Sequence, residues 1–324
     1  MHTTQDRKDA GNPYILMLIG SMPSNIKAVD FHWARAIVGR LDVVHLHWPE
    51  LLLRDPARWR SCVKKALFGL MYLRLVISRT PIVQTVHNIN PHEAASGYER
   101  RALAALTRRT RSWITLNPVP VEVPPGQVIE ILHGHYRDWF AGCERPETLP
   151  GRYLFFGLIR PYKQVVTLID AFVDLNDDSA SLRIVGACTD PDVRQRMSAL
   201  DPEQENLSAE FAYITDNRLA HEVGLAELVV LPYKEFYNSG AALLALSLGR
   251  PVLTPRNSAS EILQQEFGEE WVLLYEGALS GAHLKEAMAL RRDLESAGGL
   301  PDLSKREWDS ISTAHAGLYA QLAG

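Results

Sequence analysis

The chain has 324 residues, of which 46% are hydrophobic and 22% charged, and this ordinary globular composition excludes a repetitive or low-complexity chain. Its length predicts two domains of similar size. The net charge of -4 conceals an asymmetry, because residues 1–150 hold 19 Lys and Arg against 13 Asp and Glu, whereas residues 151–324 hold 15 against 25.

The cysteines and the N-terminus indicate a reducing compartment. Cys62, Cys143 and Cys188 lie far apart and show no C-x-x-C spacing, so neither a disulfide framework nor a zinc site is suggested. The N-terminus has no signal-peptide pattern, and the apolar run 14–20 is too short to span a bilayer. We therefore predict a cytoplasmic protein.

Short runs rich in Ile and Val alternate with longer helical patterns along the chain, which is typical of parallel sheets built from βαβ units. We predict strands at 14–20, 43–48, 81–87, 112–117, 128–134, 153–159, 181–187, 209–214, 227–233, 251–255 and 271–276. The polar segment 140–151, with two prolines and two glycines, is predicted to be a linker. The result is an α/β fold with two doubly wound domains, 1–140 and 151–302, and the apolar face of helix 303–324 is expected to pack back on the first.

The first two predicted strands are followed by polar loops. The loop after 14–20 has Gly20, Ser21 and Ser24 at an expected helix start, but it lacks the G-x-G-x-x-G of dinucleotide-binding proteins. His45 and His47 lie on the same face of the strand 43–48, as a metal pair would. Since no third ligand follows at a suitable spacing, we predict no metal site.

The basic segment 58–79 combines aromatic and aliphatic residues with six Lys and Arg. Such a helix can lie in a membrane interface, or it can be an ordinary domain helix with a solvated basic edge. A second basic cluster at 100–111 supports an anionic surface or a diphosphate-lipid acceptor. No nucleic-acid recognition motif accompanies these charges, so we predict no nucleic-acid partner.

Two further segments of the first half carry clustered histidines. The motif "VHNINPHE" places four polar residues within seven positions after a predicted strand, namely His87, Asn88, His92 and Glu93. A single histidine there would more often be structural, but the cluster favours a site. In "HGHYRDWF", His135, Tyr136 and Arg137 can either reach into a cleft or pack at a hinge.

In the second half, two loops suit a phosphate. Arg160 and Lys163 follow the strand 153–159 just before a helix, where they can bind a diphosphate or remain solvated. In "YNSGAALLALSLG", Asn238 or Ser239 can cap the next helix, and Gly240 lets a ligand approach the backbone. The alternative for this loop is an ordinary capped core helix.

Taken in order, these segments resemble the GT-B glycosyltransferases that use a nucleotide-sugar donor. A strand followed by G-x-x-x-x-x-K (Gly157 to Lys163), then "LRIVGA", "LAELVVLPY" and the G-x-P-V of Gly249 to Val252 are similar to the donor-binding domain of that family. Within it, "FFGLIRPYK", "HNINPHE", "HGHYRDWF" and "NSGAALLALSLGRPV" look most like a bacterial exopolysaccharide subgroup that includes xanthan-type β-mannosyltransferases.

The resemblance implies two Rossmann-like domains facing across a cleft, with the acceptor bound by 1–140 and the donor by 151–302. It implies no cofactor besides the nucleotide-sugar substrate. The residues it assigns to the donor are Arg160, Lys163, Tyr233, Glu235, Asn238, Ser239, Gly240 and His135.

One departure from the family bears on stereochemistry. The large retaining branch carries two glutamates eight positions apart before the G-x-P-V, and here Phe236 and Leu244 stand in those positions, with Glu235 one residue early. The loss of the second glutamate, which usually holds the donor ribose, favours inversion, and inversion needs a general base on the acceptor side. We expect Glu93 to be this base, with Glu50 or His87 as the alternatives.

The other acceptor-side roles are expected from the residues that cluster in the loops after the first-half strands. His87 is expected to contact the donor sugar, and Ser21, Asn88 and His92 to lie on the acceptor side. The predicted function is transfer of a sugar, with mannose from GDP-mannose favoured and a UDP-sugar possible, to a lipid-linked saccharide in exopolysaccharide biosynthesis at the inner face of the membrane. The alternatives are a catalytically silent nucleotide-sugar-binding protein and a sugar-nucleotide epimerase of the same fold.

Overall fold

The computed structural model describes residues 12–87, 96–119, 126–200, 204–234, 236–294 and 299–324. The chain divides into two compact units, Met1–Gly134 together with Ser304–Gly324 (unit 1) and His135–Leu303 (unit 2). Segment 140–151, which the sequence suggested as a linker, belongs to unit 2. There the Leu149 N–H donates to Leu225 O (2.9 Å) and the Arg145 side chain donates to Leu248 O (3.3 Å).

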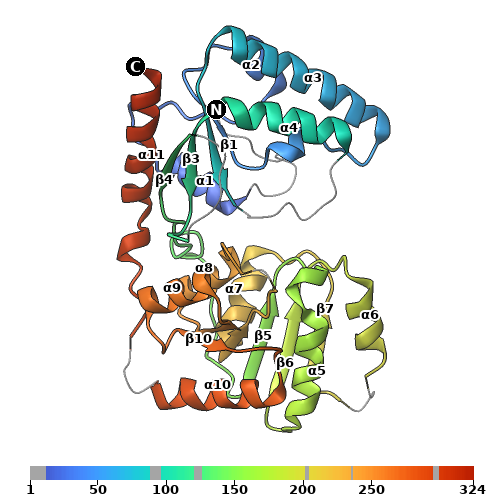
Figure 1. Cartoon of the computed structure of the whole chain (residues 1–324). Coiled ribbons are helices and arrows are strands. Elements are labelled where there is room, and N and C mark those ends of the chain that lie inside the picture. Colours follow the sequence, from blue (N-terminus) through green and yellow to red (C-terminus); the bar gives the residue numbers. More distant parts are fainter. Residues whose placement is uncertain (1–11, 88–95, 120–125, 201–203, 235, 295–298) are drawn as a thin grey trace. The chain divides into compact units, whose positions relative to one another are not determined.

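Unit 1 contains a parallel sheet in the order β1-β2-β3-β4, labelled in Figure 1. Its strands are β1 (Val44–Leu46), β2 (Ile82–Val86), β3 (Thr110–Thr115) and β4 (Gln127–Glu130). Val44, Leu46 and Ile82 bury one face of the sheet against α3 (Arg58–Ile77) and α4 (Gly97–Arg109). α2 (Trp33–Val38) packs beside α3.

The opposite face of this sheet is covered by two helices from distant parts of the chain. Val83 and Ile114 pack there against α1 (Pro13–Gly20) and α11 (Trp308–Ala323). The α11 face predicted from the sequence is the one that packs, since Trp308, Ile311, His315 and Leu318 are buried. Gly134 has to be glycine, because a Cβ there would lie 2.4 Å from the Trp308 ring.

The prediction of a strand at 14–20 is wrong, because this segment forms helix α1. Pro13 occupies the first turn, and the Asn12 side chain accepts a hydrogen bond from the Tyr14 N–H (3.0 Å). The run is apolar on every side, so periodicity alone does not distinguish a strand from a buried helix. Tyr14, Ile15 and Leu18 form the buried helical face.

Unit 2 contains a parallel sheet in the order β10-β9-β8-β5-β6-β7. Its strands are β5 (Arg152–Phe156), β6 (Ser181–Val185), β7 (Leu207–Glu210), β8 (Leu228–Val230), β9 (Val252–Pro255) and β10 (Val272–Tyr275). Its helices are α5 (Val165–Leu175), α6 (Pro191–Ser198), α7 (Asp216–Leu225), α8 (Gly240–Ser247), α9 (Ser258–Phe267) and α10 (Gly281–Leu294). The prediction of parallel strands is confirmed in both units.

Helices cover both faces of this second sheet. Tyr153 donates a hydrogen bond from its hydroxyl to Leu284 O in α10 (2.9 Å), whereas the neighbouring Arg152 pairs with Glu222 in α7 (2.7 Å). Successive side chains of a strand point to opposite faces, so α10 and α7 lie on different sides. The chain runs outward from β5 through β6 to β7 and then returns to β8 on the other side of β5. The carboxyl ends of β5 and β8 therefore form a topological switch point, where ligands bind in such sheets.

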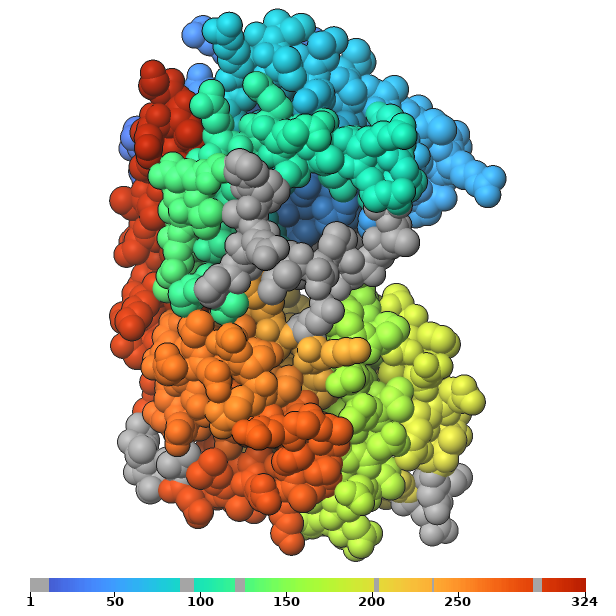
Figure 2. Space-filling view, viewed as in Figure 1, coloured from blue at the N-terminus to red at the C-terminus, as the bar shows by residue number. Residues whose placement is uncertain are grey.

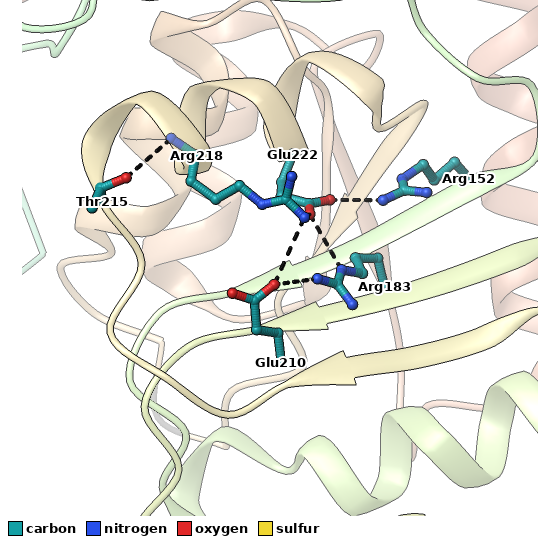
Figure 3. A network of polar contacts seen from close by, with 6 residues as sticks. All are labelled: Arg152, Arg183, Glu210, Thr215, Arg218 and Glu222. Atoms are coloured by element: carbon teal, nitrogen blue, oxygen red, sulfur yellow. Dashed lines mark hydrogen bonds and ion pairs between the residues drawn. The ribbon is translucent and has the colours of Figure 1, made fainter.

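A network of charged residues ties α7 to three neighbouring strands, as Figure 3 shows. The buried Glu222 carboxylate lies 2.7 Å from Arg152, 2.8 Å from Arg218 and 3.3 Å from Arg183. Glu210 of β7 pairs with Arg183, and the Thr215 hydroxyl accepts from the Arg218 N–H at the start of α7. Because Arg152 and Arg183 belong to β5 and β6, the network fixes α7 across this half of the sheet.

α3 is the longest helix of unit 1 and lies at its surface, where its atoms are blue in Figure 2. Its inner face is buried through Phe68, Met71 and Leu75. Within the part of the chain that the structure describes, neither α3 nor any other helix has both the length and the apolar character needed to cross a bilayer.

Candidate functional site

The loop after β5 places two cations at the switch point of unit 2. A Cβ at Gly186 would lie 1.9 Å from Gly157 O, so the ends of β5 and β6 approach closely only because residue 186 is glycine. Gly157 itself has φ +106°, a backbone conformation that favours glycine. Arg160 and Lys163 then lie around a short 3-10 helix (Pro161–Lys163) directly before α5. Lys163 Nζ folds back to 3.5 Å from the position that a Cβ of Gly157 would take.

Lys163 is held over aromatic rings rather than by a carboxylate. Its Nζ lies 4.7 Å from the centroid of the Tyr233 ring and 5.8 Å from that of Phe155. Burial, and secondarily the neighbouring Arg160 charge, lowers the pKa of Lys163 to about 8. Among the described residues neither Arg160 nor Lys163 forms an ion pair with an acidic side chain. A half-buried cation in these surroundings is suited to an anionic ligand.

The loop after β8 comes to the same end of the sheet. The Lys234 N–H donates to Tyr162 O (2.9 Å), which joins this loop to the one after β5. Ser239 is the N-cap of α8, because its hydroxyl accepts from the Ala242 N–H (3.1 Å). The preceding amides, those of Gly240 and Ala241, have no acceptor within the helix and can bind an anion.

Tyr136 lies beside this helix start. Its hydroxyl would be 3.3 Å from a Cβ at Gly240, and its N–H donates to the Ser247 hydroxyl (2.9 Å). Burial raises the pKa of the Tyr136 hydroxyl, so it remains a neutral hydrogen-bonding group. The neighbouring His135 is buried, and its Nδ1 accepts from the Arg137 N–H (3.2 Å).

The other residues predicted to bind the donor have these positions. Tyr233 is buried beneath Lys163, and within the described part of the chain its hydroxyl has no hydrogen-bond partner. Asn238 is half-buried in the loop before α8, and Glu235 lies outside the described residues. The structure thus brings Arg160, Lys163 and Tyr233 together at the switch point.

In unit 1, two histidines meet at the carboxyl ends of β1 and β2. Nδ1 of His47 lies 3.1 Å from Nε2 of His87. Trp48 stacks on the His87 ring with centroids 4.1 Å apart, and the Tyr14 ring stands edge-on to both histidines at 5.8 and 5.5 Å. These aromatic rings hold the imidazole pair in a fixed orientation.

His87 and the neighbouring His133 are uncharged at neutral pH. Burial, with a smaller contribution from His133, lowers the pKa of His87 to about 3. Burial also lowers the pKa of His133 to about 4, and Arg306 acts in the same direction. His45 uses both ring nitrogens, with Tyr319 (2.6 Å) and Thr85 (2.7 Å). No group of three or more His, Cys, Asp or Glu in the described ranges is placed to hold a metal ion.

The predicted acceptor-side residues have mixed outcomes. Ser21 lies at the C-terminal end of α1, where its hydroxyl donates to Met17 O (2.8 Å), so the expectation that it begins a helix is wrong. Glu50 is half-buried in a 3-10 helix (Pro49–Leu52) directly after β1. Asn88, His92 and Glu93 lie outside the described residues, and their roles remain predictions.

Sequence reasoning missed several aromatic residues of the candidate site in unit 1. Trp48 follows β1 directly, and this position was a usable signal. The position of Tyr14 was not predicted because 14–20 was assigned as a strand. The contact of Tyr319 with His45 was not predicted because the two residues are far apart in the sequence. Tyr136 was named in the sequence as a residue that could reach a cleft, but its contact with Gly240 at the start of α8 depends on the tertiary structure.

No family model matches the chain. The GDP-mannose:glycolipid 4-beta-D-mannosyltransferase of Xanthomonas campestris pv. campestris is 43% identical over 313 residues, which are 97% of this chain and 89% of the relative. A second sequence of that name from a strain of the same organism is 42% identical with the same coverage.

Solved structures with low sequence identity share the fold. HepE of Anabaena in complex with UDP-glucose aligns with a TM-score of 0.61 at 12% identity, over 99% of this chain and 97% of that one. Sucrose-phosphate synthase of Thermosynechococcus elongatus gives 0.57 at 17% identity, over 89% and 75%. The likeness confirms the fold class predicted from the sequence.

Proposed function

Because this chain belongs to the GT-B glycosyltransferase family of the GDP-mannose:glycolipid 4-beta-D-mannosyltransferases, we propose that it transfers mannose from GDP-mannose to a glycolipid, with inversion at the anomeric carbon, during exopolysaccharide assembly. The observation that supports donor binding best is Lys163, a half-buried cation at a switch point, beside a second cation and joined through Tyr162 and Lys234 to the loop that leads to α8. The reaction would need no metal or other cofactor, since protein groups offset the charge of the diphosphate.

In the proposed reaction, the bond between the anomeric carbon of mannose and the diphosphate oxygen breaks, and negative charge develops on GDP. Arg160, Lys163 and the amides at the start of α8 are the groups that would stabilise this charge. Preorganised donors of this kind each lower a barrier by about 3 to 4 kcal/mol. Tyr136 supplies a neutral hydroxyl next to Gly240 that can bind a phosphate oxygen or a sugar hydroxyl.

On the acceptor side, Glu93 would take the proton of the attacking hydroxyl and His87 would contact the donor sugar. We expect Glu93→Gln to abolish transfer while GDP-mannose still binds, because the amide cannot accept the proton. Unchanged transfer in this variant would move the base to Glu50, which lies after β1, or to His87 itself.

We further propose that unit 1 contacts the inner face of the membrane through α3. Trp59, Leu70, Leu73 and Ile77 of this helix are each more than half exposed. Exposed cations lie on α3 and on the segment 100–111, namely Arg58, Arg60, Arg100, Arg101, Arg108 and Arg111. Apolar side chains beside basic ones fit an anionic lipid surface.

Vesicle sedimentation tests this contact. The protein should bind phosphatidylglycerol vesicles more than phosphatidylcholine ones, and a variant with Leu70→Ser and Leu73→Ser should lose most of this binding. Leu290→Ser is a matched control, because Leu290 is an exposed leucine on α10 of unit 2. Equal binding by all three proteins would contradict the proposal.

The function itself is tested by incubating the protein with GDP-mannose, UDP-glucose or no donor, with and without a lipid-linked saccharide. Transfer of mannose with release of GDP is the expected result. Binding of the donor without any turnover would support a silent binding protein, and conversion of the donor sugar without acceptor would support an epimerase. Transfer from UDP-glucose but not from GDP-mannose would show that the proposed donor is wrong.

A further inference from the structure

Tyr233 provides the surface on which the Lys163 ammonium group lies. Nζ of Lys163 is 4.7 Å from the centroid of the Tyr233 ring and 5.8 Å from that of Phe155, so Tyr233 is the nearer of the two rings. A cation over the face of an aromatic ring is attracted by the negative charge of that face. Because Tyr233 follows β8 and Lys163 follows β5, the contact holds the cation of one loop on the ring of the other.

Packing holds the Tyr233 ring in place. Phe155 and Tyr162 meet it edge-on, with centroids 6.3 and 6.4 Å away, and the Phe236 ring lies tilted at 6.2 Å. Tyr233 is 5% exposed, and within the described ranges its hydroxyl has no hydrogen-bond partner. The Lys234 N–H donates to Tyr162 O (2.9 Å), which fixes the backbone next to the ring. The position of the ring therefore depends on its aromatic body, which phenylalanine would keep.

An aromatic partner leaves the charge of Lys163 available to a ligand. A carboxylate in the place of the ring would neutralise the ammonium group and would compete with a diphosphate for it. A ring attracts the cation more weakly than a full opposite charge does, and it cannot take up the proton. Among the described residues, the charged group that acts on the pKa of Lys163 is Arg160, which lowers it by repulsion. The ring offsets part of this repulsion without cancelling the charge.

We propose that Tyr233 is a positioning residue, whose ring face holds the charged Lys163 ammonium group at the carboxyl ends of β5 and β8, where the diphosphate of the donor would bind. The proposal rests on the proposed role of Lys163 in binding this diphosphate. In this role Tyr233 acts on the donor through Lys163, whereas the sequence predicted Tyr233 as a donor-binding residue itself. The ring carries this role, and the hydroxyl is dispensable for it.

The contact can be measured without a ligand. In full-length protein with 13C-labelled lysine, the pH titration of the ε-carbon signals reports the pKa of each lysine, and the signal lost in Lys163→Gln identifies Lys163. Tyr233→Leu removes the ring but keeps an apolar side chain, so the pKa of Lys163 should lie about 0.5 to 1.5 below the wild-type value. Tyr233→Phe keeps the ring and should recover most of this loss.

The sign of the change decides the proposal. A pKa of Lys163 in Tyr233→Leu that equals or exceeds the wild-type value would overturn it, because the ring would then only shield Lys163 from water. A pKa in Tyr233→Phe as low as that in Tyr233→Leu would assign the effect to the hydroxyl and would overturn it as well. Tyr233→Met, whose flexible side chain fills irregular space, repeats the test if the leucine variant does not fold.

Binding of GDP-mannose supplies the second arm. In calorimetry at pH 8, where about half of wild-type Lys163 is charged, Tyr233→Leu should bind the donor about two- to fifteenfold more weakly, and Tyr233→Phe should restore most of the affinity. Phe172→Leu is the matched control, because Phe172 is a buried ring of α5 that packs against Tyr153. It should lower thermal stability and leave the pKa of Lys163 and the affinity unaltered, and an equal effect in this variant would contradict the proposal. If the wild type binds no GDP-mannose, the proposed function fails, while the titration still decides whether Tyr233 holds the Lys163 cation.

Discussion

Replacing Lys163 by glutamine tests the proposed donor site directly. The substitution removes the charge but keeps a side chain of similar length between Gly157 and the Tyr233 ring. We expect the fold to be retained, because Lys163 forms no ion pair with the described acidic residues and its neutral replacement removes a charge that burial disfavours. Loss of donor binding would therefore reflect the site and not unfolding.

The size of the effect follows from the pKa of Lys163. Lowering this pKa from 10.5 to about 8 corresponds to roughly 3 kcal/mol, since a change of one in pKa is about 1.4 kcal/mol. This is the cost of charging Lys163 in its half-buried position, and a diphosphate beside Nζ can offset it. Solvent screens part of the interaction, so we expect about 2 to 3 kcal/mol, or roughly a 30- to 150-fold weaker Kd for GDP-mannose in Lys163→Gln.

Titration calorimetry with GDP-mannose at several pH values checks both the size and the sign. The phosphates of this ligand are diesters, so its own charge stays constant. Wild-type affinity should fall as the pH rises through about 8, because Lys163 loses its proton there, and Lys163→Gln should show no such fall. Lys234→Gln removes an exposed charge from the adjacent loop and serves as the control. Wild-type affinity in Lys163→Gln, or an equal loss in Lys234→Gln, would refute the reasoning.

Two further predictions concern stability. Glu222→Gln should lower the free energy of unfolding of unit 2 by about 3 kcal/mol, because it leaves three arginines around an uncharged amide. Hydrogen exchange of the α7 amides measures this loss, and Glu261→Gln, which removes an exposed ion pair with Arg256, is the near-neutral control. Unit 1 should lose stability as the pH falls below 6.5, because His87, His133 and His315 have pKa values of about 3, 4 and 4 and the unfolded state then binds more protons. The loss is about 2 kcal/mol for each histidine at pH 5, and urea denaturation that is independent of pH between 7 and 5 would contradict it.

The sequence predicted the position in the fold of those candidate site residues that depend on local structure. Arg160 and Lys163 were identified because cations follow the end of a strand, and Ser239 because it precedes a helix. The contact of Lys163 with the Tyr233 ring was beyond the sequence, since it depends on β8 lying beside β5 after the chain has formed β6 and β7. Strand order of this kind is a tertiary property that local patterns do not contain.

The error at 14–20 shows the opposite case, in which a local signal was available but carried too little weight. Asn12 and Pro13 are a preferred N-cap and first helical residue, whereas the apolar run that follows is compatible with either structure. The helix also explains why Tyr14 reaches the histidines. A strand would have added an edge to the sheet, but α1 covers the face on which His45 and His47 lie.

The pKa of His87 bears on the division of roles between His87 and the carboxylates of unit 1. A histidine with a pKa of about 3 is a weaker base than an ordinary glutamate, whose pKa is about 4.3. In unit 2, the position where the retaining enzymes carry their first glutamate holds the buried Phe236, and the second position holds Leu244 within α8. A glutamate at position 236 would lie buried near the Tyr233 ring, and burial disfavours the charged form of a carboxylate. The base is therefore expected among the glutamates of unit 1, and the neutral His87 is better suited to accept a hydrogen bond from the sugar than to remove its proton.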